Sequence, residues 1–71
     1  GSRVENRVVI EKLLQLLPPD LRTTLVLREI EQMSYEEVAQ AMNVPVGTVR
    51  SRLHTARERF RDLWLQENRD V

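Results

Sequence analysis

Residues 34–53 read SYEEVAQAMNVPVGTVRSRL, and their spacing predicts two helices separated by a short break. Ser34 and Glu37 have the spacing of a capping box, in which the serine caps the helix and the glutamate bonds back to the serine backbone. The first helix then runs to about Met42 and breaks at Asn43-Val44-Pro45, because the residue before a proline disfavours helical geometry. A short helix, a brief turn and a longer helix form the pattern of a helix-turn-helix.

The helix that follows the break carries its apolar residues on one narrow stripe. These residues recur at steps of four, three, four and three, at Val49, Leu53, Ala56, Phe60 and Leu63. At about 100° per residue they share one face, which we expect to pack on the core. We expect this helix to run from about Val46 to the neighbourhood of Trp64, with the residues after Gln66 fraying.

The chain before Ser34 supplies two further helices. The first ends at Pro18-Pro19-Asp20 and has a wide apolar sector made of Val9, Ile10, Leu13, Leu14, Leu16 and Leu17. The second runs from about Leu21 to Glu31 and is apolar on two sides, which predicts the most buried helix of the domain. Neither sustained alternation nor a hairpin turn indicates a strand. The sequence therefore predicts an all-α, compact four-helix domain containing a helix-turn-helix with a long C-terminal recognition helix.

The length of 71 residues limits the chain to one small domain. We expect residues 1–2 to be a cloning scar, residues 3–66 to form the domain and residues 67–71 to be a frayed tail. We also expect the natural chain to extend further at one or both ends. No apolar run approaches the roughly 20 residues that span a bilayer, and the lack of cysteine suits a reducing cytoplasm. A cytoplasmic domain without membrane insertion is therefore expected.

Few residues of this chain are suited to catalysis or to metal binding. It has no cysteine, one tyrosine and one histidine, and no second ligand or base lies near His54 in the sequence. A proton-transfer pair would need carboxylates in a pocket, which so small a core does not imply. We expect no enzyme activity, no cofactor and no metal site.

Charge is segregated along the chain, although eleven basic and eleven acidic residues cancel. Residues 46–61 hold five arginines and one acid, a net charge of +4, whereas residues 29–37 hold four acids and no base, a net charge of −4. Ten of the eleven basic residues are arginine, whose guanidinium suits bidentate contacts to phosphates and base edges. Two solvated helix faces are one interpretation, and a nucleic-acid face with a separate protein face is the other.

The outward face of the last helix predicts a surface that reads DNA. Recognition helices enter the major groove by their N-terminal end. The outward residues of the first two turns are Arg50, Ser51, His54 and Thr55. Arg50 suits a bidentate contact to guanine, while Arg52 and Arg57 flank the strip and suit phosphates on opposite walls of the groove. For His54, a base contact and a solvated surface position both remain open.

Gly47 and Thr48 lie in the first turn of this helix, where a glycine costs about 1 kcal/mol of helix propensity relative to alanine. The missing side chain lets backbone N–H groups approach a DNA phosphate closely, and Thr48 can cap locally or donate to that phosphate. The alternative for Gly47 is tight packing in the turn between the two helices.

These motifs together resemble region 4 of bacterial sigma factors, specifically the group-four, extracytoplasmic-function class. The resemblance covers residues 8–62 and is carried by Leu17-Pro18, Leu21-Arg22, Leu27-Arg28-Glu29, Ser34–Ala39, Val46–Leu53 and Ala56-Arg57. It implies a helical domain that binds the promoter −35 element, typically GGAAC-like, and docks on the flap of the RNA polymerase β subunit. It also implies capture by an anti-sigma factor, and we expect the isolated domain to be monomeric.

Carried over by position, the resemblance implies base contacts from Arg50, Ser51 and His54 and DNA backbone contacts from Arg28 and Arg52. The part of such proteins that melts the promoter is missing, so we expect the C-terminal domain of a larger sigma factor that cannot initiate transcription alone. Zero net charge predicts weak non-specific DNA affinity, since little counterion release is available. Promoter binding would then rely on tethering to the polymerase.

Two positions depart from the pattern of this family. Pro45 stands where relatives often have a serine that caps the recognition helix, so the helix start lacks a side-chain cap. Thr55 stands where many relatives carry arginine, which removes one potential DNA contact and alters the preference.

Two other functions are compatible with a similar fold. In some response regulators a sigma-like module sequesters an anti-sigma factor without reading DNA, and such a mimic has no need of Arg50, Arg52 and Arg57. The output domain of a two-component regulator is a similar four-helix unit, but the run PVGTVRSR at residues 45–52 fits that family less well. The wide apolar face of the first helix and the acidic residues 29–37 still suggest a protein partner.

Overall fold

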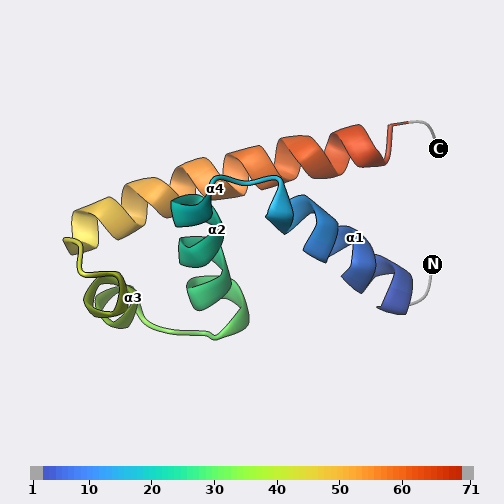
Figure 1. The fold of residues 1–71 in the computed structure, drawn as a ribbon. Helices are drawn as coiled ribbons and strands as arrows, with labels where there is room; N and C mark the ends of the chain where they lie inside the picture. Colours follow the sequence, from blue (N-terminus) through green and yellow to red (C-terminus); the bar gives the residue numbers. More distant parts are fainter. Residues whose placement is uncertain (1–2, 70–71) are drawn as a thin grey trace.

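The computed structural model describes residues 3–69, which form four α-helices, one π-helical turn and no strand. The elements are α1 (Arg3–Gln15), α2 (Pro19–Leu25), η1 (Val26–Ile30), α3 (Tyr35–Met42) and α4 (Val46–Glu67). Figure 1 shows α4 lying along one side of the molecule, with α2 and α3 against its N-terminal half and α1 beside its C-terminal half. The predicted all-α, four-helix fold is confirmed. The longest dimension is 40 Å because the 22 residues of α4 extend for about 33 Å.

The start and the end of α3 are set by local sequence signals. The Ser34 hydroxyl oxygen accepts a hydrogen bond from the Glu37 backbone N–H at 3.0 Å, and Glu37 Oε1 accepts one from the Ser34 N–H at 2.8 Å. The predicted capping box is therefore confirmed. The hydrogen bond donated by the Ser34 backbone N–H, with a smaller contribution from the Ser34 side chain, lowers the pKa of the Glu37 carboxyl below its ordinary value. The helix ends at Asn43, whose left-handed φ of 57° turns the chain toward α4.

The helix α4 begins without a side-chain cap, as the sequence predicts. Pro45 is the N-cap residue and makes no side-chain hydrogen bond, while its carbonyl oxygen accepts from the N–H groups of Thr48 and Val49 at 3.0 and 3.2 Å. The helix ends at Glu67, three residues beyond Trp64 and one beyond Gln66, after which we expect fraying. Of the tail that we expect to fray, residues 70–71 lie outside the described residues.

The core lies where the N-terminal half of α4 meets α2 and α3. Its buried members are Leu14, Leu17, Leu21, Leu25, Val38, Ala39, Val49, Leu53 and Ala56. The predicted stripe of α4 is confirmed, because its first three members are buried and Phe60 and Leu63 pack half-buried against the same cluster. Thr24 is the polar residue buried beside them, and its hydroxyl donates to the Asp20 carbonyl oxygen at 2.7 Å.

The second helix differs from its prediction in both form and burial. The sequence predicts one α-helix from Leu21 to Glu31, whereas α2 gives way to the wider turn η1, in which the Glu31 N–H bonds to the Val26 carbonyl oxygen at 3.0 Å. A π-helical turn holds one more residue than an α-helical turn, so later residues leave the alignment expected at 100° per residue. Ile30 is accordingly 57% exposed, whereas Val26 and Leu27 on the same side pack half-buried against the core, so the predicted burial on two sides holds only for the part of the helix before Ile30.

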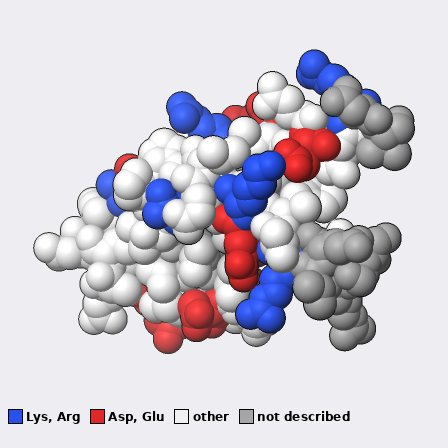
Figure 2. All heavy atoms as spheres, turned by 45° about the vertical axis from the view of Figure 1, so that its right-hand side comes forward, with Lys and Arg blue, Asp and Glu red and all other residues white. Residues whose placement is uncertain are grey.

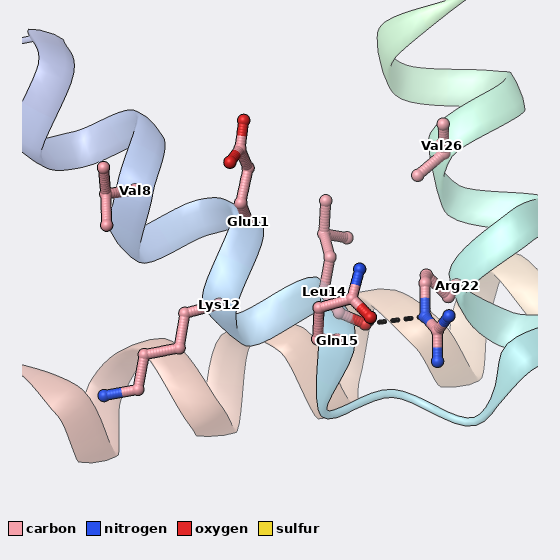
Figure 3. Close-up of a pocket in the computed structure, with 7 residues that line it drawn as sticks. All are labelled: Val8, Glu11, Lys12, Leu14, Gln15, Arg22 and Val26. Atoms are coloured by element: carbon pink, nitrogen blue, oxygen red, sulfur yellow. Dashed lines mark hydrogen bonds between the residues drawn. The ribbon is translucent and has the colours of Figure 1, made fainter.

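The helix α1 is anchored at its C-terminal end. Leu13, Leu14 and Leu17 are buried, whereas Leu16 is 60% exposed, so the wide apolar sector of this helix is only partly covered. Arg22 of α2 donates to the carbonyl oxygens of Leu14 and Leu17, both at 3.1 Å, and so ties α2 to the end of α1 and the residues that follow it. Figure 3 shows the bond to Leu14 and the open pocket that separates the rest of α1 from α2 and η1.

Candidate nucleic-acid interface

The first turns of α4 present most of the predicted DNA-reading residues to solvent. The exposed residues are Gly47, Arg50, Ser51 and His54, and the half-buried ones are Thr48, Arg52 and Thr55. Burial of Val49 and Leu53 fixes this orientation, since the positions next to them must then point outward. Thr55 is thus less accessible than the other three residues that we expect to meet bases. We call Arg50, Ser51 and His54 the reading strip.

Tyr35, the first residue of α3, lies beside arginines from two other elements. The guanidinium carbon of Arg28 lies 4.8 Å from the centre of the tyrosine ring, and that of Arg50 lies 6.0 Å from it. Both distances lie within the range of cation–π attraction. Arg28 also donates to the Met33 carbonyl oxygen at 2.8 Å. The ring of Tyr35, in the first helix of the helix-turn-helix, therefore lies next to Arg50, the first residue of the reading strip in the second helix.

Arg52 and Arg57 each face a carboxylate from another element. Arg52 Nε lies 3.7 Å from Oδ2 of Asp20 in the first turn of α2. Arg57 donates from Nε, at 2.8 Å, and from Nη2 to Oε1 of Glu29 in η1. The hydrogen bonds that Arg57 donates to Glu29 raise the pKa of Arg57 above its ordinary value. Both arginines that we expect to hold phosphates are therefore paired within the folded domain.

The two charge blocks of the sequence come into contact in the folded domain. In Figure 2, basic and acidic side chains alternate over the middle of the visible face and form no single basic patch. The ion pair of Arg57 with Glu29 joins the basic residues 46–61 to the acidic residues 29–37. The two blocks therefore meet through this ion pair, which brings one acidic residue of η1 to the side of α4.

A groove between the start of α3 and α4 runs beside the reading strip. Its lining includes Tyr35 and four nitrogen-bearing side chains of α4, namely Arg50, His54, Arg57 and Arg61. Groups that donate hydrogen bonds to base edges or to phosphates are thus concentrated along one edge of the recognition helix.

Gly47 is not required by the packing of the domain. A Cβ atom at this position would meet nothing within 4 Å, and the residue does not have a positive φ. The alternative of tight packing between the two helices is therefore wrong. The remaining interpretation is close approach of another molecule to the first turn of α4, which also has no side-chain cap.

The described residues include neither a metal-binding cluster nor a membrane-spanning helix. Among the side chains that the structure describes, those of residues 6–69, no group of three or more is able to hold a metal ion. His54 Nε2 lies 3.4 Å from Glu58 Oε1 at the surface, with 74% of the histidine side chain exposed. Within the same range no helix is both long and apolar enough to cross a bilayer.

Comparison with known proteins places this helix-turn-helix in a family. A family model described as "Sigma-70, region 4" matches residues 7–60, from α1 through most of α4. The chain belongs to the sigma-70 region 4 family. The predicted resemblance is thereby confirmed, over nearly the same residues, and the output domain of a two-component regulator is not favoured.

Curated sigma factors match this region 4 domain closely. The RNA polymerase sigma-H factor of Pseudomonas aeruginosa is 54% identical over 56 residues, which are 79% of this chain and 29% of that protein. The ECF RNA polymerase sigma-E factors of Escherichia coli and Salmonella typhimurium are 50% identical over 54 residues, 76% of this chain and 28% of theirs. The chain therefore spans less than a third of the length of the curated relatives it matches.

Proposed function

We propose that this region 4 domain binds the promoter −35 element as part of an RNA polymerase sigma factor. The observation that carries the proposal is the exposure of Arg50, Ser51 and His54 on one strip of α4, within a helix-turn-helix whose opposite face is the core. Arg50 donates to O6 and N7 of a guanine in the major groove, and Ser51 and His54 make less selective contacts. Thr55, which is half-buried, lies at the edge of this surface.

A second group of residues holds the DNA backbone in this proposal. Its members are Arg28, Gly47, Thr48, Arg52 and Arg57. The uncapped first turn of α4 and the open space at Gly47 support a phosphate bound by backbone N–H groups. Arg52 and Arg57, with side chains 26% and 48% exposed, can exchange an acidic partner for a phosphate.

Protein partners form the other part of the proposal. A groove between α1, η1 and α4 is almost wholly apolar and is lined by Ile10, Leu14, Leu25, Val26, Ile30 and Phe60, with Glu29 and Arg57 at its polar edge. Such a groove suits a hydrophobic partner segment. We infer docking on the β flap of cytoplasmic RNA polymerase, capture by an anti-sigma factor, and a monomeric state for the isolated domain.

Titration of the isotope-labelled domain by NMR tests DNA recognition directly. A GGAAC-containing duplex is compared with a scrambled duplex of the same composition. We expect chemical-shift changes confined to residues 46–57 and Arg28, and larger with the GGAAC duplex. Equal, weak and salt-sensitive changes with both duplexes would contradict sequence-specific reading and leave only attraction to phosphates.

Replacement of Gly47 should separate stability from DNA binding. The variant Gly47→Ala is expected to raise the free energy of unfolding by about 1 kcal/mol, because alanine favours the helix and its Cβ meets no neighbour. The same methyl group obstructs the approach of a phosphate to the first turn, so affinity for both duplexes should fall. Thermal unfolding and fluorescence anisotropy measure the two effects.

The matched control for this variant is Gln66→Ala, on the exposed face of the last turns of α4. It also introduces an alanine into α4, but it is far from the reading strip and should leave DNA affinity unchanged. If Gly47→Ala bound both duplexes as tightly as the parent, no phosphate would approach this turn.

A further inference from the structure

The ion pair between Glu29 and Arg57 connects η1 to α4 across 28 positions of sequence. Arg57 donates from both Nε and Nη2 to a single carboxylate oxygen, so one edge of the guanidinium is committed to Glu29. The two side chains are 48% and 46% exposed, so solvent reaches both of them and the pair can open without disturbing the core.

Arg57 lies where an arginine on this helix would reach DNA. It follows His54 by three residues, nearly one helical turn, and lines the same groove as Arg50, His54 and Tyr35. A phosphate and a carboxylate engage the same edge of a guanidinium with the same paired hydrogen bonds. An Arg57 bonded to Glu29 is therefore not free to bind a phosphate through that edge.

The other arginines of this surface are held differently. Among the described residues, no carboxylate lies within 4.0 Å of the Arg50 guanidinium, which faces the Tyr35 ring. The approach of Arg52 to Asp20 is longer, at 3.7 Å, and has no accompanying hydrogen bond. The shortest contact between α4 and a carboxylate is thus made by Arg57, which suits a phosphate. Arg50, which suits a base, has no such contact among the described residues.

We propose that Glu29 competes with DNA phosphates for Arg57 and so limits the affinity of the domain for DNA of any sequence. This inference rests on the proposed DNA-binding function and adds a restraint to it. A phosphate must displace Glu29 before it gains Arg57, and the displaced carboxylate then repels the phosphate. Contacts to phosphates alone therefore contribute little net free energy of binding. The reading strip then contributes a larger share of that free energy.

The test is the variant Glu29→Gln, with affinity measured by fluorescence anisotropy for the GGAAC and scrambled duplexes at several salt concentrations. We expect both duplexes to bind about two- to fivefold more tightly, the change that opening one exposed ion pair can produce. The slope of log affinity against log salt concentration should become steeper by about the amount that one additional phosphate contact produces. The preference for GGAAC should stay the same or fall.

Two further variants separate competition from a simple change of net charge. Glu36→Gln removes one charge from the same acidic block, and Glu36 forms no ion pair with any described residue. Its effect on affinity should be clearly smaller than that of Glu29→Gln. In the background of Arg57→Gln, the change Glu29→Gln should have no more effect than Glu36→Gln has, because the group that is competed for is absent.

The outcomes are distinct. Equal effects of Glu29→Gln and Glu36→Gln, or an effect of Glu29→Gln that persists without Arg57, would overturn the competition. Weaker binding by Glu29→Gln would also overturn it, since Glu29 would then position Arg57 for DNA. A parent domain that binds neither duplex would contradict the proposed function itself. Circular dichroism establishes that each variant is folded.

Discussion

The variant Arg50→Ala is expected to abolish the preference of the domain for a GGAAC duplex over a scrambled one. Arg50 is the exposed arginine at the N-terminal end of α4, the end by which a recognition helix enters the major groove. A bidentate contact between arginine and guanine contributes about 1–3 kcal/mol of discrimination, which is roughly five- to 150-fold in affinity. Binding of the scrambled duplex should change only by the loss of one positive charge.

The matched control for Arg50→Ala is Arg61→Ala. Arg61 is an exposed arginine on the same side of α4, about three turns further along, where the helix should be leaving the groove. Its replacement removes the same charge but should lower the affinity for both duplexes equally. If Arg50→Ala kept the preference of the parent, the reading strip would lie elsewhere on the domain.

The variant Leu53→Ala is expected to remove a large share of the free energy of unfolding of the domain. The Leu53 side chain is 1% exposed, between α4 and the helices α2 and α3. Truncation of a buried leucine costs about 2–5 kcal/mol, because transfer free energy is lost and a cavity remains. The free energy of unfolding of native domains is about 5–15 kcal/mol, and a chain of this length lies toward the lower end of that range.

Leu65→Ala is the control for Leu53→Ala, because it is the same substitution in the same helix at a site that is 59% exposed. Its free energy of unfolding should lie within about 0.5 kcal/mol of the parent value. Thermal and urea unfolding followed by circular dichroism measure both variants. Similar stabilities of the two would mean that α4 does not pack through the face containing Val49 and Leu53.

The features predicted correctly are those that neighbouring residues determine. The capping box depends only on Ser34 and Glu37, three positions apart, and the start of α4 follows from Pro45. The stripe from Val49 to Leu63 identifies the buried face of α4 because helical periodicity is regular. Once that face is known, the outward position of Arg50 and its neighbours follows from helix geometry alone.

The features that the sequence did not reveal depend on contacts between distant segments. The residues of η1, Val26–Ile30, are ordinary for an α-helix, and nothing in their order indicates a π-helical turn. The pairing of Arg57 with Glu29 depends on how that turn lies against α4. The position of Tyr35 beside Arg28 and Arg50 likewise requires three elements to meet. The only signal for it was that the single tyrosine of the chain directly follows the cap residue of α3.

The length of α4 has a consequence for how the domain responds to its surroundings. Its first half is enclosed by α2 and α3, whereas its last turns lie beside α1, which Lys12 joins to Glu67 at the far end. Leu13, Leu14 and Leu17 hold the C-terminal end of α1 and the residues just after it to the core, whereas Val8 and Ile10 are exposed. Local opening of the exposed part of α1 can therefore occur while Val49 and Leu53 remain packed. A molecule that binds there gains access to apolar surface and leaves folded the end of α4 that carries the reading strip.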